Sequence, residues 1–212
     1  MHKSKVSTPG KKDFKPKVSI VILNWNGIKH LKTFLPSVYN TKYENLEIVI
    51  GDNNSSDGSV EYIKASYPNI RLIINEQNYG FARGYNEVLK KVVADYYVIL
   101  NSDVELSDNW LSDVVEFMNE NPKAAACQPN IIDFKDQSKY EYAGAAGGFI
   151  DSLGFPFCRG RLFETLENIQ ASYSNTKEVF WASGACLIIR SELFHKMGGF
   201  DADFFAHQEE ID

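Results

Sequence analysis

YYVILNSDVEL, residues 96–106, decides the fold, because in it an apolar strand runs directly into an acidic loop. Residues 96–100 are aromatic or branched and apolar, which is typical of a strand covered on both faces of a sheet. Asn101, Ser102 and Asp103 follow without the glycine or proline that marks an ordinary turn. In an open parallel sheet, ligands bind at the carboxyl ends of the strands. The segment therefore predicts that Asp103 lies at a binding site.

The rest of the chain alternates short apolar runs with stretches of helical spacing. Strands are expected at residues 17–23, 46–50, 70–74 and 124–128, and helices after Gly27, after Asp57 as a cap, from Gly80 and after Ser107 as a cap. This β-α-β-α order predicts an α/β fold, a mostly parallel central sheet with helices on both faces. Residues 133–178 lose the pattern, so we expect a mobile insertion over one face of the sheet. An apolar strand within residues 179–190 and a helix near 192–196 follow it.

Composition limits the class of protein. The chain has 212 residues, 44% of them hydrophobic, and a formal charge of −6, which argues against a general nucleic-acid binder. Three cysteines without a CxxC spacing indicate reduced core thiols in a cytosolic protein. No apolar run reaches membrane-spanning length. We therefore expect a cytoplasmic protein.

The two ends of the chain differ from the middle. Residues 1–16 are expected to be a disordered basic tail, because the first 17 positions hold six lysines and two prolines. The tail is either simply solvated or attracted to the anionic inner face of a membrane, so peripheral membrane association stays open. The final HQEEID resembles the first turn of a helix, and we expect the chain to be truncated there.

Polar residues follow each expected parallel strand: Asn24-Trp25-Asn26, Asp52-Asn53-Asn54, Asn75 to Asn78, and Asn101-Ser102-Asp103. Singly, each group is explained by turn formation. Together at one edge of a sheet, amides and a carboxylate suit a nucleobase and a ribose, and Trp25 can pack near a ring. Neither a GxGxxG nor a GxxxxGK[ST] motif is present. DNNSSDG does not fit a calcium loop, because Asp57 stands where that loop requires glycine and Ile63 where it requires glutamate.

Without a glycine-rich cradle, a nucleotide diphosphate needs another source of positive charge. A divalent cation held by Asp103 at the strand end supplies it. Arg83, one turn into the helix after Gly80, can add a fixed positive charge.

Several segments in order carry a resemblance to a known family: VSIVILNWNG, IVIGDNNSSDGS, NEQNYGFARGYN, VILNSDVEL, WASGACLIIR, MGGFDADFF and HQEEID. With them, residues 17–212 resemble family 2 glycosyltransferases of the GT-A fold, inverting enzymes that use nucleotide-diphosphate sugars, and in particular a rhamnosyltransferase-like subgroup. The resemblance implies a Rossmann-like nucleotide-sugar half at about residues 17–130. It also implies an acceptor-side half at about residues 131–212.

The resemblance also assigns roles residue by residue. Base and ribose would be held by Leu23, Asn24, Trp25, Asp52 and Asn53, and the donor pocket would be lined by Asn78, Gly80 and Arg83. Asn101, Ser102 and Asp103 occupy the family's DxD position, where Asn101 replaces the first Asp, so that Asp103 alone would bind Mn²⁺ or Mg²⁺. Trp181, Ser183, Gly184 and Asp201 would face the acceptor side.

Glu210 matches the family's catalytic base, with Glu209 next in line. On residue type alone, an acidic pair at the start of a helix is explained by the helix dipole, and His207 nearby by a surface position.

The implied function is transfer of a sugar, with inversion, from a UDP- or dTDP-sugar to a glycan or lipid-linked acceptor in cell-surface polysaccharide synthesis. Two alternatives remain. One is a truncated module that binds a nucleotide sugar without turnover. The other is a nucleotidyltransferase, which would need a glycine-rich basic loop that NWNGIKHL does not supply.

Overall fold

The computed structural model describes residues 15–142, 146–169, 173, 175–205 and 211. The expected basic tail lies outside the described residues except for its last two. The first of these, Lys15, forms an exposed ion pair with Glu44 at 2.9 Å. None of the described helices is both long enough and apolar enough to cross a membrane.

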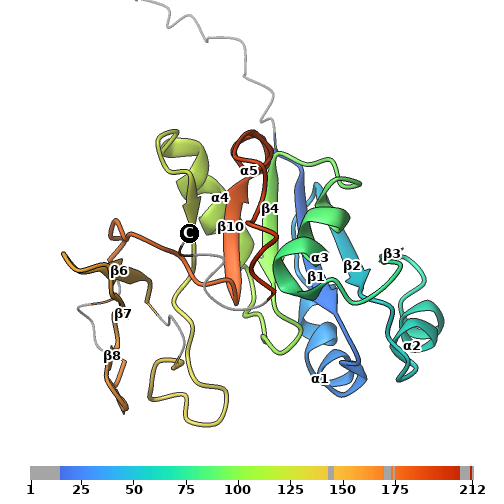
Figure 1. Cartoon of the computed structure of the whole chain (residues 1–212), viewed down its shortest axis with the longest axis horizontal. Coiled ribbons are helices and arrows are strands. Elements are labelled where there is room, and N and C mark those ends of the chain that lie inside the picture. The colour runs from blue at the N-terminus through green and yellow to red at the C-terminus, as the bar shows by residue number, and fades with distance from the viewer. Residues whose placement is uncertain (1–14, 143–145, 170–172, 174, 206–210, 212) are drawn as a thin grey trace, which may run out of the picture.

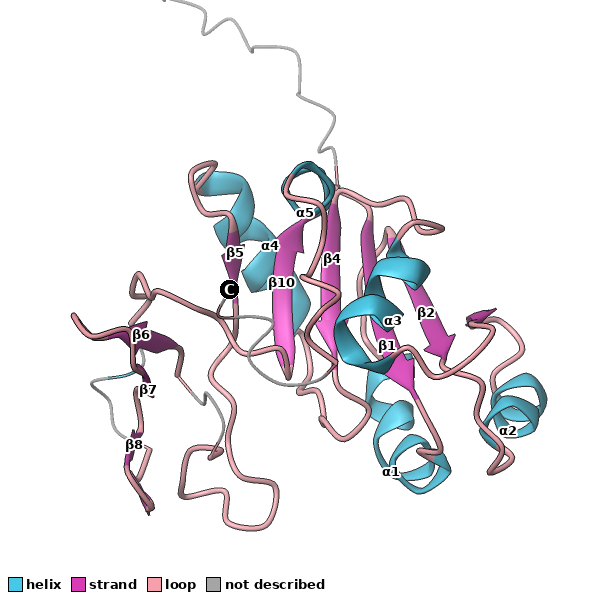
Figure 2. Ribbon diagram, viewed as in Figure 1, coloured by secondary structure: helices cyan, strands magenta, loops and turns pink. Residues whose placement is uncertain are grey.

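A six-stranded sheet in the order β3-β2-β1-β4-β10-β5 forms the centre of the molecule (Figure 2). The strands are β1 (Val18–Asn24), β2 (Leu46–Asp52), β3 (Arg71–Ile74), β4 (Tyr96–Leu100), β5 (Ala126–Cys127) and β10 (Cys186–Arg190). Strands β1 to β4 pair in parallel, and β10 runs antiparallel to both of its neighbours. The prediction of a mostly parallel α/β sheet is therefore confirmed.

Helices cover both faces of this sheet. They are α1 (Ile28–Tyr39), α2 (Ser59–Ser66), α3 (Gly80–Leu89), α4 (Trp110–Glu120) and α5 (Ser191–Lys196). In β1, Ile20 and Ile22 pack with α1, α2 and α4 in one core cluster, whereas Val21 packs with α3 and α5 in the other. Because side chains alternate along a strand, a continuous apolar run supplies both cores.

Asp57 joins the starts of two helices. Its carboxylate accepts the Ser59 backbone N–H at 3.0 Å, at the first residue of α2, and the Ile28 backbone N–H at 2.9 Å, at the first residue of α1. Both are N–H groups without a partner inside their own helix. The N-cap position of α2 is Gly58, one residue later than the predicted cap, but the Asp57 carboxylate still binds the first N–H of the helix.

Three predicted element boundaries were wrong. Ser107 does not cap α4, because Asn109 takes a left-handed conformation (φ 60°) and the helix begins only at Trp110. Strand β5 is two residues long. Strand β10 starts at Cys186 because a turn precedes it, in which the Cys186 N–H donates to the Ser183 carbonyl at 3.3 Å.

The insertion forms two small hairpins, β6 (Gly148–Ile150) with β7 (Pro156–Cys158), and β8 (Arg161–Leu162) with β9 (Thr165–Leu166). They lie beside the β10–β5 side of the sheet (Figure 1) and not over one of its faces. The expected position over a face was therefore wrong. These strands are too short to cover the sheet, and a bridge between Gly148 and Trp181 ties the first hairpin to the segment that leads into β10.

Candidate functional site

The carboxyl ends of β1, β2 and β4 meet at one edge of the sheet. Asn24 is paired in register with Asp52, and Ile22 with Leu100, so residues 101–103 leave β4 alongside the end of β1. A Cβ atom on Gly27 would lie 3.7 Å from the Ser102 hydroxyl, which shows how closely the two loops pack. The topology therefore brings the predicted residues after these three strands together.

Asn24 and Asp52 form a buried pair at this edge. The Asn24 Nδ2 group donates to Asp52 Oδ2 at 2.8 Å and to Ser55 Oγ at 3.1 Å. Asp52 Oδ1 accepts the Ser55 backbone N–H at 2.7 Å. Asn24 Oδ1 is buried and has no hydrogen-bond partner among the described residues. The pair fixes the conformation of the loop after β2 relative to β1.

Asn53 connects three segments through its side chain, which is 2% exposed. Its Nδ2 group donates to Asn78 Oδ1 at 3.2 Å and to the Gly80 carbonyl at 2.9 Å. Its Oδ1 accepts from Asn75 Nδ2 at 2.8 Å. Both ends of the amide are thus bound by protein groups, and the network holds the end of β2 against the start of α3.

Gly80 sits where another segment crosses the start of α3. It has φ +73°, and a Cβ atom there would lie 2.3 Å from the Phe205 carbonyl oxygen. The Phe81 N–H donates to that same oxygen at 2.7 Å, and Asn86 makes two hydrogen bonds with the Phe200 backbone. Only glycine fits this position. Residues 200–205 are thereby held along α3.

Three predicted residues lie exposed around the edge. Trp25 is 57% exposed, and the Arg83 guanidinium stacks 4.3 Å from the Tyr79 ring centroid. Asp201 lies on the crossing segment, and its carboxylate accepts the Asp203 N–H at 2.9 Å.

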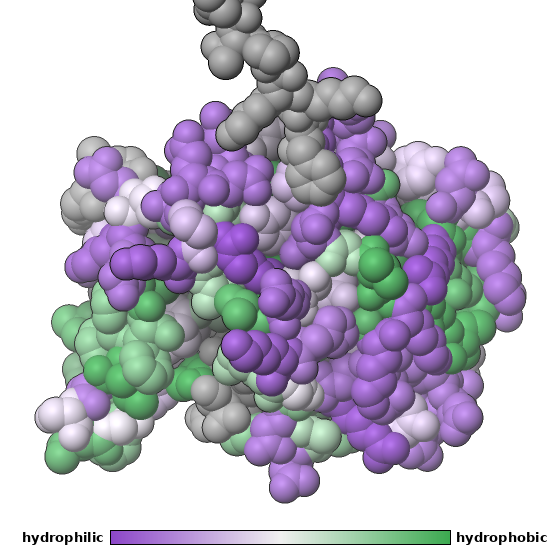
Figure 3. Space-filling model, turned by 90° about the horizontal axis from the view of Figure 1, so that it is seen from above, coloured by the Kyte–Doolittle hydropathy of each residue, from purple (hydrophilic) through white to green (hydrophobic). Residues whose placement is uncertain are grey.

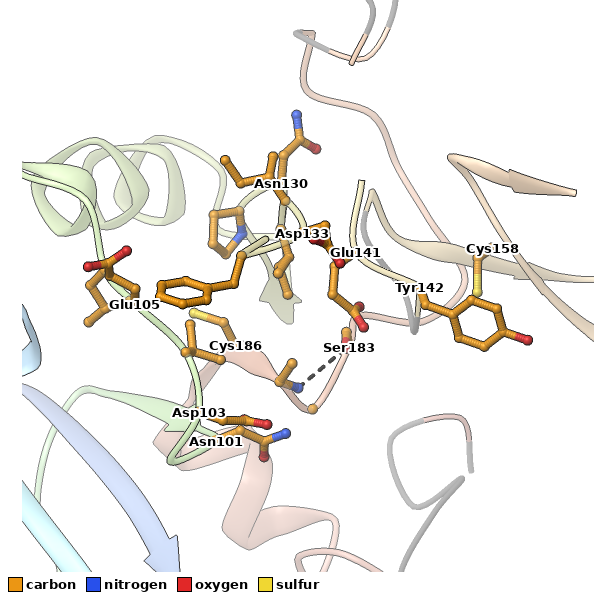
Figure 4. Close-up of a pocket in the computed structure, with 18 of the residues that line it drawn as sticks. Asn101, Asp103, Glu105, Asn130, Asp133, Glu141, Tyr142, Cys158, Ser183 and Cys186 are labelled. Atoms are coloured by element: carbon orange, nitrogen blue, oxygen red, sulfur yellow. Dashed lines mark hydrogen bonds between the residues drawn. The ribbon is translucent and has the colours of Figure 1, made fainter. Parts of the chain in front are cut away.

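A cavity of about 1200 Å³ opens beside this edge, between β4, β10 and the insertion. Asn101 and Asp103 lie at one end of it, with Ser183 and Glu141 across from them (Figure 4). The predicted acceptor-side residues Trp181, Ser183 and Gly184 line the same cavity. Ile211, which follows Glu210 in the sequence, lines it too.

Trp181 and Ser183, which form one wall of the cavity, are fixed by contacts with neighbouring protein groups. Trp181 is 7% exposed, its indole N–H donates to the Phe149 carbonyl at 3.2 Å, and its ring fills the space where Gly148 lacks a side chain. Ser183 is buried, and its hydroxyl accepts the Ala185 N–H at 3.2 Å. The wall is therefore rigid before any ligand arrives.

Asp103 provides an exposed carboxylate at the cavity, with the Asn101 amide beside it (Figure 4). Within the described ranges, no three His, Cys, Asp or Glu side chains are grouped closely enough to hold a metal ion by themselves. One carboxylate and an amide oxygen fit a cation that shares its remaining ligands with water and substrate phosphates. They do not fit a cation caged by protein alone.

The acidic pair Glu209 and Glu210, together with His207, lies outside the described residues, so their assigned roles stay predictions. The sequence reasoning missed other side chains. Glu141 and Tyr142 come from the insertion and line the cavity. The only signal for them was a charged and aromatic pair within an otherwise irregular segment.

Tyr85 was also missed. It is fully buried in α3, its hydroxyl accepts the Leu23 N–H at 3.2 Å and donates to the Leu100 carbonyl at 3.0 Å. It thereby ties the ends of β1 and β4 to each other, just before the site loops. In the sequence it reads only as a core position of a helix.

Comparisons with known proteins agree with this geometry. The model of a family described as glycosyl transferase family 2 matches residues 19–198. An N-acetylglucosaminyl-diphospho-decaprenol L-rhamnosyltransferase of Mycobacterium tuberculosis is 27% identical, over 91% of this chain and 67% of its own length. A structure of GalNAc-T7 with UDP, GalNAc and Mn²⁺ has a TM-score of 0.68 at 18% identity, over 95% of this chain and 40% of that one.

A structure of the mannosyltransferase PcManGT from Pyrobaculum calidifontis, in complex with GDP-Man and Mn²⁺, has a TM-score of 0.63 at 18% identity. The match covers 93% of this chain and 51% of that one. The chain thus spans about half or less of the two solved proteins. At this identity they show the fold, which is the α/β fold of GT-A glycosyltransferases. The family match covers most of the chain, and the chain belongs to glycosyl transferase family 2.

Proposed function

We propose that this glycosyltransferase binds a nucleotide-diphosphate sugar, a UDP- or dTDP-sugar, where β1, β2 and β4 end, and transfers the sugar to a hydroxyl of a glycan or lipid-linked acceptor. One observation carries the proposal. Asp52 and Asp103 flank the end of β1 at a single sheet edge, and Asp103 opens into a cavity of about 1200 Å³. That volume suits a ligand with more than one ring.

The nucleoside is assigned to the β1–β2 side of the edge. Trp25 offers an exposed ring there, and Leu23, Asn24, Asp52 and Asn53 shape the loops around it. Because the side chains of Asn24, Asp52 and Asn53 are buried and largely engaged by protein groups, we assign all three to positioning the loops that receive the base and ribose.

The diphosphate is assigned to the space between the start of α3 and the end of β4. Asn78 accepts the Gly80 N–H at 2.9 Å and orders the first turn of α3, whose helix dipole favours a negative charge nearby. Arg83 adds positive charge one turn further on. Asp103 with Asn101 would hold Mn²⁺ or Mg²⁺, which when bound neutralises charge on the leaving nucleotide diphosphate.

A carboxylate of the chain would accept the proton of the acceptor hydroxyl as a general base. The acceptor oxygen attacks the anomeric carbon, the bond from that carbon to the diphosphate oxygen breaks, and the hydroxyl proton passes to Glu210, with Glu209 as the second candidate. Attack from the side opposite the leaving group inverts the anomeric centre. The rigid wall at Trp181, Ser183 and Gly184 excludes water and positions the reacting sugar.

Calorimetric titration of UDP and dTDP with and without Mn²⁺ tests donor binding. We expect cation-dependent binding that Asp103→Asn weakens by about tenfold or more. Asparagine has nearly the same shape as aspartate but lacks the negative charge that a hard cation needs in its ligand. Glu105→Gln, an exposed acid two residues further on that also lines the cavity, is the matched control. Equal affinity in the wild type and Asp103→Asn would overturn the metal assignment.

The base is tested in transfer assays of the full-length protein. Glu210→Gln should keep donor affinity and lose about a hundredfold or more in rate, as expected when a general base is removed. Transfer that survives in Glu210→Gln but not in Glu209→Gln would move the base by one residue.

We further propose that the enzyme works at the cytoplasmic face of a membrane, on an intermediate of cell-surface polysaccharide. This rests on the name of the Mycobacterium tuberculosis relative, which describes a lipid-linked acceptor.

A further inference from the structure

The charges that line the cavity are unequal. Its described lining residues include four carboxylates, from Asp103, Glu105, Asp133 and Glu141, and a single Lys or Arg side chain, Arg161. An isolated guanidinium in an acidic cavity is either paired with one of these acids or free for an anionic ligand.

An aromatic ring and a thiol are the neighbours that hold the Arg161 side chain. No described carboxylate lies within ion-pair distance of it. Its guanidinium stacks 4.0 Å from the Tyr142 ring centroid, and one nitrogen lies 3.8 Å from Cys158 Sγ. Stacking fixes the plane of the guanidinium and leaves the N–H groups along its edge to bind phosphate in a bidentate way.

Arg161 lies far from the proposed metal position. Tyr142, on which it stacks, and Cys158 lie at the end of the cavity opposite Asn101 and Asp103 (Figure 4). The donor diphosphate at Asp103 therefore leaves Arg161 unused. The cavity therefore offers two separate positions for negatively charged groups. One is at Asp103, where a bound metal ion would hold the group, and the other is at the Arg161 guanidinium.

Exposed apolar side chains continue outward from Arg161. Leu162 and Phe163 follow it at the tip of the β8–β9 hairpin and are 67% and 87% exposed. Leu153 and Phe155 are likewise exposed at the tip of the β6–β7 hairpin. Figure 3 shows apolar surface gathered on the side of the molecule where these hairpins lie. Large apolar residues concentrated at hairpin tips indicate an interaction surface.

We propose that the acceptor is a lipid with a phosphate or diphosphate between its sugar and its hydrocarbon chain. Arg161 binds the phosphate, and the hairpin tips at residues 153–155 and 162–163 contact the hydrocarbon. The inference rests on the proposed function and names the acceptor class of the same cavity. The exposed apolar side chains at the hairpin tips follow directly on the Arg161 guanidinium, which favours this occupant over a neutral glycan. A neutral glycan would contact neither the charge nor the apolar side chains.

Farnesyl diphosphate, kept below its micelle concentration, is a probe with both chemical features. Binding to the full chain is measured in EDTA, so that no metal holds the diphosphate at Asp103. We expect Arg161→Gln to weaken binding about tenfold to a hundredfold, the effect of losing a charge-assisted bidentate contact. Arg159→Gln is the matched control, since Arg159 is a neighbouring arginine stacked on Tyr173 and does not line the cavity.

A second variant tests the hydrocarbon half. Leu162→Thr combined with Phe163→Asn removes both apolar side chains, and Asn tolerates the φ of +51° at position 163. It should weaken farnesyl diphosphate binding about tenfold and leave pyrophosphate binding unchanged. Thermal melting identifies a variant that has lost its fold.

The outcomes separate the two ideas. Wild-type protein that binds farnesyl diphosphate no better than pyrophosphate, or Arg161→Gln equal to Arg159→Gln, overturns the lipid acceptor. Mn²⁺-dependent UDP binding in the same preparations checks the proposed function independently, and Arg161→Gln should leave it unchanged. A wild-type protein that binds farnesyl diphosphate but does not bind UDP with Mn²⁺ would overturn the proposed donor site and leave the proposed acceptor standing.

Discussion

Replacing Asn53 with alanine is the sharpest test of the amide network at the sheet edge. The side chain makes three hydrogen bonds, with Asn75, Asn78 and the Gly80 carbonyl, at 2.8 to 3.2 Å. Alanine removes all three at once. It also leaves the buried Gly80 carbonyl and Asn75 amide short of a partner in a place that water does not reach.

The size of the effect follows from these contacts. Each hydrogen bond contributes about 1 kcal/mol net, so we expect the free energy of unfolding to fall by about 3 kcal/mol. For a domain of this size, each kcal/mol lowers the melting temperature by about 2–4 °C, which predicts a loss of about 6–12 °C. Because α3 begins at Gly80, whose N–H is bound by Asn78, affinity for the proposed donor should also fall.

Calorimetric melting of purified variants measures this directly. Asn168→Ala is the control, because Asn168 is exposed and its side chain makes no hydrogen bond with the described residues. Asn53→Asp replaces the amide donor with an oxygen that faces the Gly80 carbonyl, so this variant should also melt at a lower temperature than wild type. If Asn53→Ala melts within about 2 °C of wild type, the network does not hold the site, and the Asn53 amide is available to a ligand.

Three further predictions concern the supports of the site and the thiols. Tyr85→Phe leaves the Leu23 N–H without its hydroxyl partner, and urea unfolding should show a loss of about 1–3 kcal/mol. Burial raises the pKa of Asp57, but hydrogen bonds from the starts of α1 and α2 outweigh it and hold that pKa below its usual value. The stability gap between wild type and Asp57→Ala should therefore be full above about pH 4 and vanish as pH falls through the lowered pKa. Burial raises the pKa of Cys127 and Cys186 to about 12, so mass spectrometry should find neither alkylated by iodoacetamide at pH 8 until the protein unfolds.

The central sheet was predictable because its signal is local. Ile20, Val21 and Ile22 are apolar in succession, which requires burial on both faces, and the parallel order follows from the alternating helices. Element ends were less predictable. Asn109 takes a left-handed conformation that its sequence neighbours do not dictate, and this delays α4 by two residues.

The site was predictable in position and not in detail. Topology alone placed Asp52 and Asp103 at one edge, because parallel strands end together. The partners of Asn53 lie 22 to 27 residues away, and the ring under Arg161 lies 19 positions earlier in an irregular segment. Such contacts depend on tertiary packing, which no window of sequence contains.

The proposed donor side, at the sheet edge, and the proposed acceptor side, at the hairpins of the insertion, differ in a way that bears on specificity. The donor side is built from buried, mutually hydrogen-bonded groups at strand ends, where a change such as one at Asn53 disturbs the fold together with the ligand. The acceptor side is built from short hairpins whose tips, such as Phe163, are largely exposed and contribute little to either core. Substitutions there alter ligand contacts at little cost in stability. We therefore expect substitutions in the hairpins to change contacts with the proposed acceptor while leaving the sheet edge intact.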